Sequence, residues 1–154
     1  MEDDRLDQLR QLGYIVNSVD KHKEHFEEIL EMKPFSILDN RPANEVHYEN
    51  EDRMVKIKNG LFNVGSLQVE LIEVLEGKCY QGDWLKENGP GIHHLAFFTD
   101  NLDNQIKKFE ELGIEVIQTG NIMGGIKFAY AKALDTLGVD IEIVELKKRK
   151  KKKK

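Results

Sequence analysis

The apolar and polar positions of the chain follow one pattern twice. Residues 11–30 and 94–113 each begin as an apolar run rich in aromatic and β-branched residues, which is typical of a buried strand. Each run ends in side chains suited to a turn and a helix N-cap, Asn17-Ser18 and Asp100-Asn101. An amphipathic helix is expected to follow in each copy. The predicted apolar stripes are Phe26, Ile29 and Leu30 in the first helix and Ile106, Phe109 and Leu112 in the second.

Identical residues at fixed offsets indicate that this pattern is an internal repeat. The matches at an offset of 83 are Leu12/Leu95, Asp20/Asp103, Phe26/Phe109, Glu27/Glu110 and Glu28/Glu111. At an offset of 72, VELIEV (69–74) aligns with IEIVEL (141–146), which pairs Glu70 with Glu142 and Glu73 with Glu145. Further strands are expected near 34–38, 54–63, 67–75, 114–118, 126–133 and 139–146.

The repeat predicts one domain, residues 1–146, built from two related βαβββ modules. The modules span about 6–75 and 91–146, and the linker 76–90 is expected to contain a short helix around Asp83–Glu87. The lysine-rich tail 147–154 has nothing to pack against, so we expect it to be disordered.

The distribution of charge excludes one class of partner. Eight of the 23 basic residues lie in the tail, so the remaining body carries 15 basic against 28 acidic residues, a net charge of about −13. Nucleic-acid binding needs a basic face on the fold itself, so nucleic acid is not expected as the main partner.

The chain also lacks the sequence marks of secretion or membrane insertion. The polar, acidic start MEDDRLDQLRQ does not resemble a signal peptide, and no segment approaches the roughly 20 apolar residues that span a bilayer. Cys79 is the only cysteine, so no intrachain disulfide can form. We therefore expect a cytoplasmic protein with no membrane partner.

Four polar residues lie on otherwise apolar or small-residue faces of the predicted strands: Gln11, Glu70, His94 and Glu142. A carboxylate on such a face is costly unless something compensates its charge, and a metal ion does so directly. The repeat makes Gln11 equivalent to His94 and Glu70 equivalent to Glu142, so a pseudo-two-fold axis would bring all four to one centre. One histidine nitrogen and three oxygen ligands suit a divalent ion such as Co, Ni, Mn, Mg or Zn.

Each of these residues, taken alone, has a simpler interpretation. A single glutamate in a strand usually faces solvent, and we expect this of Glu73 and Glu145, which face away from the ligand candidates. His93 shares its expected strand face with apolar residues, which favours a structural or supporting role. His47, in the polar stretch 43–53, could reach a ligand.

Three segments resemble the vicinal oxygen chelate superfamily, which includes lactoylglutathione lyase (glyoxalase I) and methylmalonyl-CoA epimerase. They are GPGIHHLAFFTDNLDNQIKKFEELGIEV (89–116), GSLQVELIEVLEG (65–77) and GGIKFAYAKALDTLGVDIEIVE (124–145). The resemblance covers about residues 6–146. It implies an α+β, glyoxalase-like fold in which two tandem βαβββ modules form a cupped mixed sheet around a metal, often in a homodimer.

The resemblance assigns roles to the four residues. Glu70, His94 and Glu142 fall on metal ligands of the family, and Gln11 falls where epimerases usually carry histidine and some glyoxalase I lineages carry glutamine. Enzymes of the family remove a proton next to a carbonyl, with a metal-stabilised enediolate and a carboxylate that moves the proton. We expect Glu142 to be that base, with Glu70 as its counterpart on the other side.

The function implied most directly is a metal-dependent epimerase of the methylmalonyl-CoA epimerase type, acting on an acyl-CoA thioester. Two alternatives stay open: a glyoxalase-I-like lactoylglutathione lyase and a metal-free small-molecule-binding module. The complete set of four ligand candidates argues against the binding module.

Overall fold

A computed structural model describes residue 6 and residues 8–39, 41–122 and 125–146; the lysine-rich tail, which we expect to be disordered, lies outside this range. The strands and helices, in chain order, are β1 (Leu9–Ile15), α1 (Val19–Leu30), β2 (Ser36–Leu38), β3 (Asn44–Tyr48), β4 (Glu51–Val64), β5 (Leu67–Glu76), α2 (Tyr80–Asn88), β6 (Gly91–Thr99), α3 (Leu102–Glu111), β7 (Val116–Ile122), β8 (Ile126–Ala131), α4 (Leu134–Leu137) and β9 (Asp140–Glu145).

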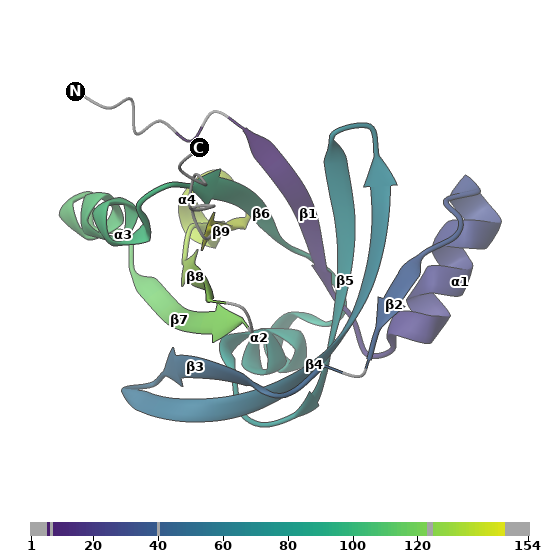
Figure 1. Ribbon diagram of the computed structural model, residues 1–154, viewed down its shortest axis with the longest axis horizontal. Coiled ribbons are helices and arrows are strands. Elements are labelled where there is room, and N and C mark those ends of the chain that lie inside the picture. The colour runs from purple at the N-terminus through teal and green to yellow at the C-terminus, as the bar shows by residue number, and fades with distance from the viewer. Residues whose placement is uncertain (1–5, 7, 40, 123–124, 147–154) are drawn as a thin grey trace, which may run out of the picture.

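The strands form one mixed sheet in the order β2-β4-β3-β7-β8-β9-β6-β1-β5, and a further pairing of β4 with β5 closes it into a barrel-like ring (Figure 1). The fold is therefore α+β, as predicted, and its cupped sheet closes on itself. The two halves meet at two antiparallel seams, β1 against β6 and β3 against β7. Within each half, the first strand runs parallel to the last, β1 beside β5 and β6 beside β9.

The strand β3 was not predicted from the sequence, because its residues lie in the polar stretch 43–53. Both β2 and β3 run antiparallel to β4, β2 against residues 59–61 and β3 against residues 51–55. Together they form the second strand of the first βαβββ half, interrupted between Leu38 and Asn44. In the second half the uninterrupted β7 has the same place.

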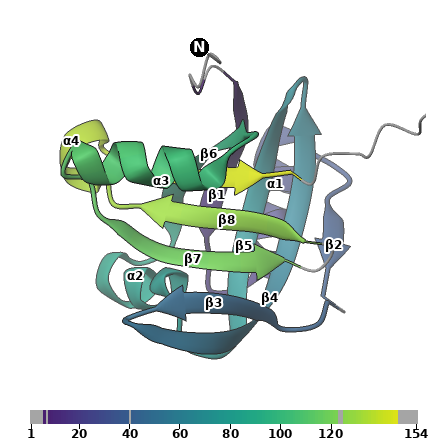
Figure 2. The same ribbon diagram turned by 60° about the vertical axis from the view of Figure 1, so that its left-hand side comes forward.

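The helices α1 and α3 cover the outside of the ring on opposite sides, as Figures 1 and 2 show. Val19 and Phe26 anchor α1 in one outer cluster, and Leu102, Ile106 and Phe109 anchor α3 in another. The residues inside the ring form a third cluster, to which Cys79, Tyr80 and Trp84 at the start of α2 contribute. No helix in the described part of the chain is long and apolar enough to cross a membrane.

The predicted N-caps are confirmed, whereas the predicted apolar stripes are only partly right. The Ser18 side chain accepts from the backbone N–H of Lys21, and the Asn101 side chain accepts from that of Asn104. The stripe residues at the C-terminal ends are exposed to solvent: Ile29 and Leu30 in the last turn of α1, and Leu112 directly after α3.

The repeated glutamates on the outer face do not simply face solvent, which corrects the expectation for both. The Oε2 atom of Glu73 accepts a hydrogen bond of 2.8 Å from the backbone N–H of Val19. In the same way Oε2 of Glu145 accepts one of 2.7 Å from Leu102. Each glutamate thus satisfies the first N–H group of the helix in its own half, where the helix dipole also favours a negative charge.

Candidate metal centre

The pairing of the strands reproduces the internal repeat residue by residue. The equivalent pairs are Gln11 opposite Gln68 and His94 opposite Asp140, then Gly13 opposite Glu70 and Ala96 opposite Glu142. The antiparallel seam between β1 and β6 sets Gly13 opposite His94. The two glutamates therefore come from the two strands that flank this central pair, one from each half.

Both central strands carry an irregularity directly before the predicted ligand. The β1–β6 register skips one residue of β1 between Leu9 and Gln11, and it skips His93 of β6 between Ile92 and His94. An extra, unpaired residue of this kind is a β-bulge, which redirects side chains locally. Because of the bulge, His93 does not lie on the outer face with its neighbours. Its ring packs inside against those of Tyr80 and Trp84.

Three of the predicted ligands converge inside the ring. The ligand atoms of Glu70, His94 and Glu142 all lie within 4.8 Å of one another. From Nε2 of His94, the distance is 3.1 Å to Oε2 of Glu142 and 3.7 Å to Oε2 of Glu70. His94 and Glu142 are buried, and the Glu70 side chain is 15% exposed.

A glycine makes this convergence possible. A Cβ atom on Gly13 would lie 2.0 Å from Cε1 and 2.2 Å from Nε2 of His94, so the imidazole ring occupies the space of the missing side chain. No larger residue fits there without displacing the ring. Gly13 is thus the strand position that admits His94 to the interior.

Of the three side chains in the triad, His94 is the one that can carry a positive charge to offset the two carboxylates. Burial alone would lower the pKa of His94, but its contacts with Glu142 and then Glu70 outweigh burial and raise the pKa to about 9. Burial raises the pKa of Glu70; the contact with His94 opposes this shift and the charge of Glu142 adds to it. The two carboxylates around one imidazole therefore share a single compensating charge.

This arrangement fits a divalent cation. Nε2 of His94 is fully buried and, among the described residues, has no hydrogen-bond partner of acceptable geometry despite the two nearby carboxylates. A cation at the centre of the three groups would satisfy the nitrogen and neutralise the carboxylates together. One imidazole nitrogen and two carboxylate oxygens are ligands that suit Zn, Co, Ni or Mn.

Gln11 stays a prediction as the fourth ligand. Its Nε2 donates a hydrogen bond of 2.6 Å to Oε1 of Gln68, its partner on β5. This bond fixes the amide and leaves its carbonyl oxygen as the atom available to a metal. His47 could reach a ligand only outside the ring, since it lies on the outer face of β3, 54% exposed, with Nδ1 2.9 Å from Oδ1 of Asp52.

Several residues around the triad were not found from the sequence. Asn59 donates from Nδ2 to Oε1 of Glu70 over 3.1 Å. The Tyr130 ring lies edge-on to His94 with centroids 5.1 Å apart. Burial, followed by the charges of Glu142 and Glu70, raises the pKa of Tyr130, so its hydroxyl stays protonated. The signal that could have found Tyr130 is its place on the strand opposite Glu142.

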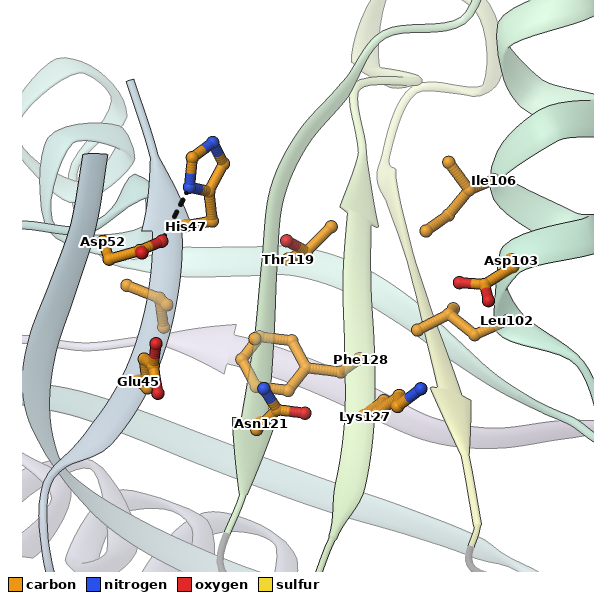
Figure 3. A pocket seen from close by; sticks show the side chains of 12 residues that line it. Glu45, His47, Asp52, Leu102, Asp103, Ile106, Thr119, Asn121, Lys127 and Phe128 are labelled. Atoms are coloured by element: carbon orange, nitrogen blue, oxygen red, sulfur yellow. Dashed lines mark hydrogen bonds and ion pairs between the residues drawn. The ribbon is translucent and has the colours of Figure 1, made fainter. Parts of the chain in front are cut away.

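Of two hollows in the described part of the chain, only the smaller one is lined by residues of the triad. A small one of about 50 Å³ inside the ring is lined by both carboxylates, by Tyr130 and by Arg41, its positively charged residue. A larger one of about 260 Å³ lies outside the ring between α3 and the strands β3, β7 and β8 (Figure 3). Because the larger hollow contains none of the triad, we assign the candidate site to the smaller one.

The sequence places the chain in a known family. Residues 10–130 match the Glyoxalase/Bleomycin resistance protein/Dioxygenase superfamily, so the chain belongs to this superfamily. A relative from Bacillus subtilis (strain 168), the uncharacterized protein YqjC, is 30% identical over 122 residues, which cover 73% of this chain and 86% of the relative.

Solved structures share the fold at lower sequence identity. Methylmalonyl-CoA epimerase from Mycobacterium tuberculosis superposes with a TM-score of 0.64 at 20% identity, over 96% of this chain and 93% of the other. A single-residue variant of methylmalonyl-CoA epimerase from Streptomyces coelicolor, in complex with 2-nitronate-propionyl-CoA, gives a TM-score of 0.64 at 18% identity, over 92% of this chain and 95% of the other. At these identities the likeness shows the fold.

Proposed function

We propose that the chain is a metal-dependent epimerase of the methylmalonyl-CoA epimerase type, which moves the proton α to the thioester carbonyl of an acyl-CoA. One observation carries the proposal: the carboxylates of Glu70 and Glu142 flank His94 from opposite halves of the ring. An epimerase must remove a proton from one face of a carbon and return one to the other face, which needs two acid–base groups on opposite sides.

The environment of the two carboxylates suits this chemistry. Burial raises the pKa of Glu70, and a carboxylate with a raised pKa is a stronger base towards a carbon acid. When bound, a divalent ion at the triad would supply a Lewis acid that stabilises negative charge on the substrate carbonyl oxygen. Glu142, the more buried carboxylate, is proposed as the base and Glu70 as the group that returns the proton.

The cavity residues support an anionic substrate. Arg41 lines the same small hollow as the two glutamates and sets a positive charge beside them. Asn59 holds Glu70 through its other oxygen, so Oε2 of Glu70 is oriented towards the centre. The structures of this fold include an epimerase bound to 2-nitronate-propionyl-CoA, which is the reason to propose an acyl-CoA.

The test is exchange of the α-proton into D₂O. Protein reconstituted with Co²⁺ is mixed with (2S)-methylmalonyl-CoA, and loss of the α-proton NMR signal is followed over time. The proposal expects catalysed exchange that a chelator abolishes. No exchange with any of a panel of acyl-CoAs, from protein holding one equivalent of metal, would exclude an epimerase.

The same preparation separates the alternatives. Conversion of the methylglyoxal–glutathione hemithioacetal without acyl-CoA exchange would indicate a lactoylglutathione lyase instead. Binding of less than one equivalent of metal after reconstitution would favour a metal-free binding module. The homodimer implied by the family resemblance stays a prediction, which light scattering of the same sample tests.

A further inference from the structure

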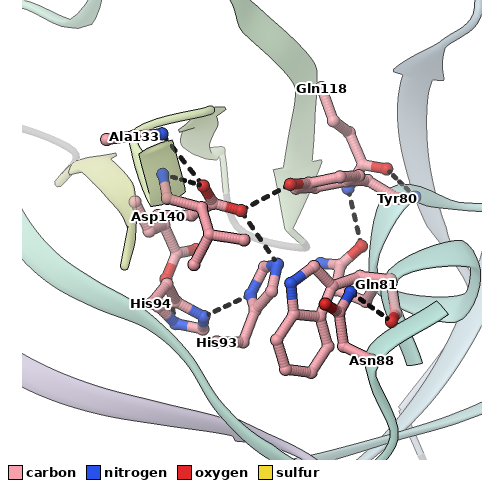
Figure 4. A network of polar contacts seen from close by, with 11 residues as sticks. Tyr80, Gln81, Asn88, His93, His94, Gln118, Ala133 and Asp140 are labelled. Carbon is pink, nitrogen blue, oxygen red and sulfur yellow. Dashed lines mark hydrogen bonds and ion pairs between the residues drawn. The ribbon is translucent and has the colours of Figure 1, made fainter. Parts of the chain in front are cut away.

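A chain of buried polar side chains leads from the candidate metal centre to the start of α4 (Figure 4). Nδ1 of His94 lies 2.9 Å from Nδ1 of His93. On the other side of His93, Nε2 lies 3.6 Å from Oδ2 of Asp140. All three residues are at most 1% exposed, so the chain is isolated from solvent.

The partners of Asp140 fix it as an acceptor. Oδ1 accepts hydrogen bonds from the backbone N–H groups of Ala133, at 2.9 Å, and Leu134, at 3.1 Å. Oδ2 accepts one from the hydroxyl of Tyr80. Since all three neighbours are donors, Asp140 is a carboxylate with no hydrogen of its own to offer. Its negative charge faces Nε2 of His93.

This charge determines where the hydrogen of His93 lies. A nitrogen lone pair turned to a carboxylate is repelled and an N–H group is attracted, so Nε2 of His93 carries the hydrogen. Its Nδ1 is then an acceptor. The 2.9 Å contact between the two rings requires one hydrogen, which must come from Nδ1 of His94. With Nδ1 donating to His93, Nε2 is the nitrogen of His94 left to present a lone pair to a metal, and it is the atom that faces Glu70 and Glu142.

We propose that His93 and Asp140 are positioning residues, which hold His94 in the tautomer and ring orientation that presents Nε2 to a metal. This inference rests on the proposed metal site. It extends that site to a residue that reaches the interior only because of the bulge in β6. Metal-bound histidines commonly donate their other ring N–H to a fixed acceptor, which here is a second histidine backed by a carboxylate.

The first half of the repeat supports this interpretation. The counterpart of His94 is Gln11, whose amide is held directly by its strand partner Gln68 over 2.6 Å. His94 and its own strand partner Asp140 are equivalent to that pair. In both halves the side chain at this position is therefore followed by a polar group from the neighbouring strand, Gln68 directly in the first half and Asp140 beyond His93 in the second.

The experiment compares His93→Phe, His93→Asn and Asp140→Asn with the unmodified chain, by Co²⁺ titration and visible absorption. The phenylalanine removes the acceptor, and we expect Co²⁺ binding to weaken by about 10–100-fold. Asparagine offers Oδ1 near the former Nδ1, so it should restore most of the affinity. In Asp140→Asn an amide N–H faces Nε2 of His93, so the hydrogen of each ring moves to the other ring nitrogen. Co²⁺ binding should then weaken about as much as in His93→Phe.

Two further measurements separate positioning from general damage. In the Zn²⁺-loaded protein, ¹⁵N chemical shifts should show His94 protonated at Nδ1 in the unmodified chain, and this signal should be lost in Asp140→Asn. Val55→Ala, which opens a cavity in the same interior cluster, should lower the melting temperature and leave Co²⁺ affinity unchanged.

The variants also give results that overturn the proposal. The proposal is overturned if His93→Phe leaves the Co²⁺ affinity and spectrum unchanged. It is also overturned if His93→Phe and His93→Asn lose the same Co²⁺ affinity. If the unmodified chain itself binds no Co²⁺, the metal site fails. The ¹⁵N shifts of the metal-free protein then still decide whether His93 accepts from Nδ1 of His94.

Discussion

The imidazole ring of His94 fills the space that a side chain at Gly13 would occupy, with the position of a Gly13 Cβ 2.0 Å from Cε1 of His94. The two residues face each other across the antiparallel seam of the two halves. The candidate centre therefore depends on the absence of a side chain on one half and the presence of an imidazole on the other.

Gly13→Ala is expected to expel the ring of His94. Forcing a methyl group into this space should cost about 1–3 kcal/mol of unfolding free energy and abolish stoichiometric Co²⁺ binding. The matched control is Gly82→Ala in α2, where a new Cβ would meet only Cys79 Sγ at 3.9 Å. Urea denaturation and Co²⁺ titration of both variants check this, and full Co²⁺ binding by Gly13→Ala would refute it.

Removing the charge of either central glutamate is expected to reduce α-proton exchange. Glu142→Gln and Glu70→Gln each retain the shape of the side chain but lose the group that accepts a proton, so exchange should fall by about 10²–10⁴-fold. Glu76→Gln, on the exposed end of β5, is the control and should retain its rate. The comparison uses rates of deuterium incorporation at saturating metal; equal rates in all three variants would argue against the roles assigned to Glu70 and Glu142.

The glutamates that hold the helix starts should affect stability and not exchange. Glu73→Ala and Glu145→Ala each leave the first N–H of a helix without its acceptor, at a cost of about 1 kcal/mol. The repeat predicts similar losses in the two halves. Urea denaturation measures them, and a loss confined to one half would show that the equivalence is only geometric.

Metal uptake is expected to release protons. The pKa of His94 in the metal-free protein is raised to about 9 by Glu142 and Glu70, so below pH 9 a cation must displace the proton from the ring. Apparent affinity for Co²⁺ should therefore rise by about tenfold for each pH unit between pH 6.5 and 8.5. Calorimetry in buffers of different ionisation enthalpy counts the protons; a pH-independent affinity would contradict the coupling.

The internal repeat accounts for much of what the sequence could predict. Matching the two halves correctly paired Glu70 with Glu142, and the strand register shows the same equivalence. The strict alternation of side chains failed at His93, because a bulge adds one residue and turns both histidines inward. A bulge of this kind depends on pairing between distant strands, so it leaves no local pattern in the sequence.

Two other errors have a similar origin. β3 has alternating exposed and buried residues, but its polar outer residues Glu45 and His47 masked the strand pattern. Glu73 and Glu145 looked like solvent-facing residues because the groups that they bind, the N-termini of α1 and α3, are distant in sequence. Predicting such contacts requires the helix to be docked on the sheet, which a single sequence does not specify.

The central claim is that Glu70, His94 and Glu142 bind one divalent metal ion. A crystal of the Co²⁺-loaded protein, measured at the cobalt absorption edge, tests it most directly. The structure predicts one strong anomalous peak within coordination distance of Nε2 of His94 and of an oxygen from each glutamate, and the map would also decide whether Gln11 completes the ligand set. A protein that holds stoichiometric cobalt elsewhere, with no peak between these three side chains, would contradict the account.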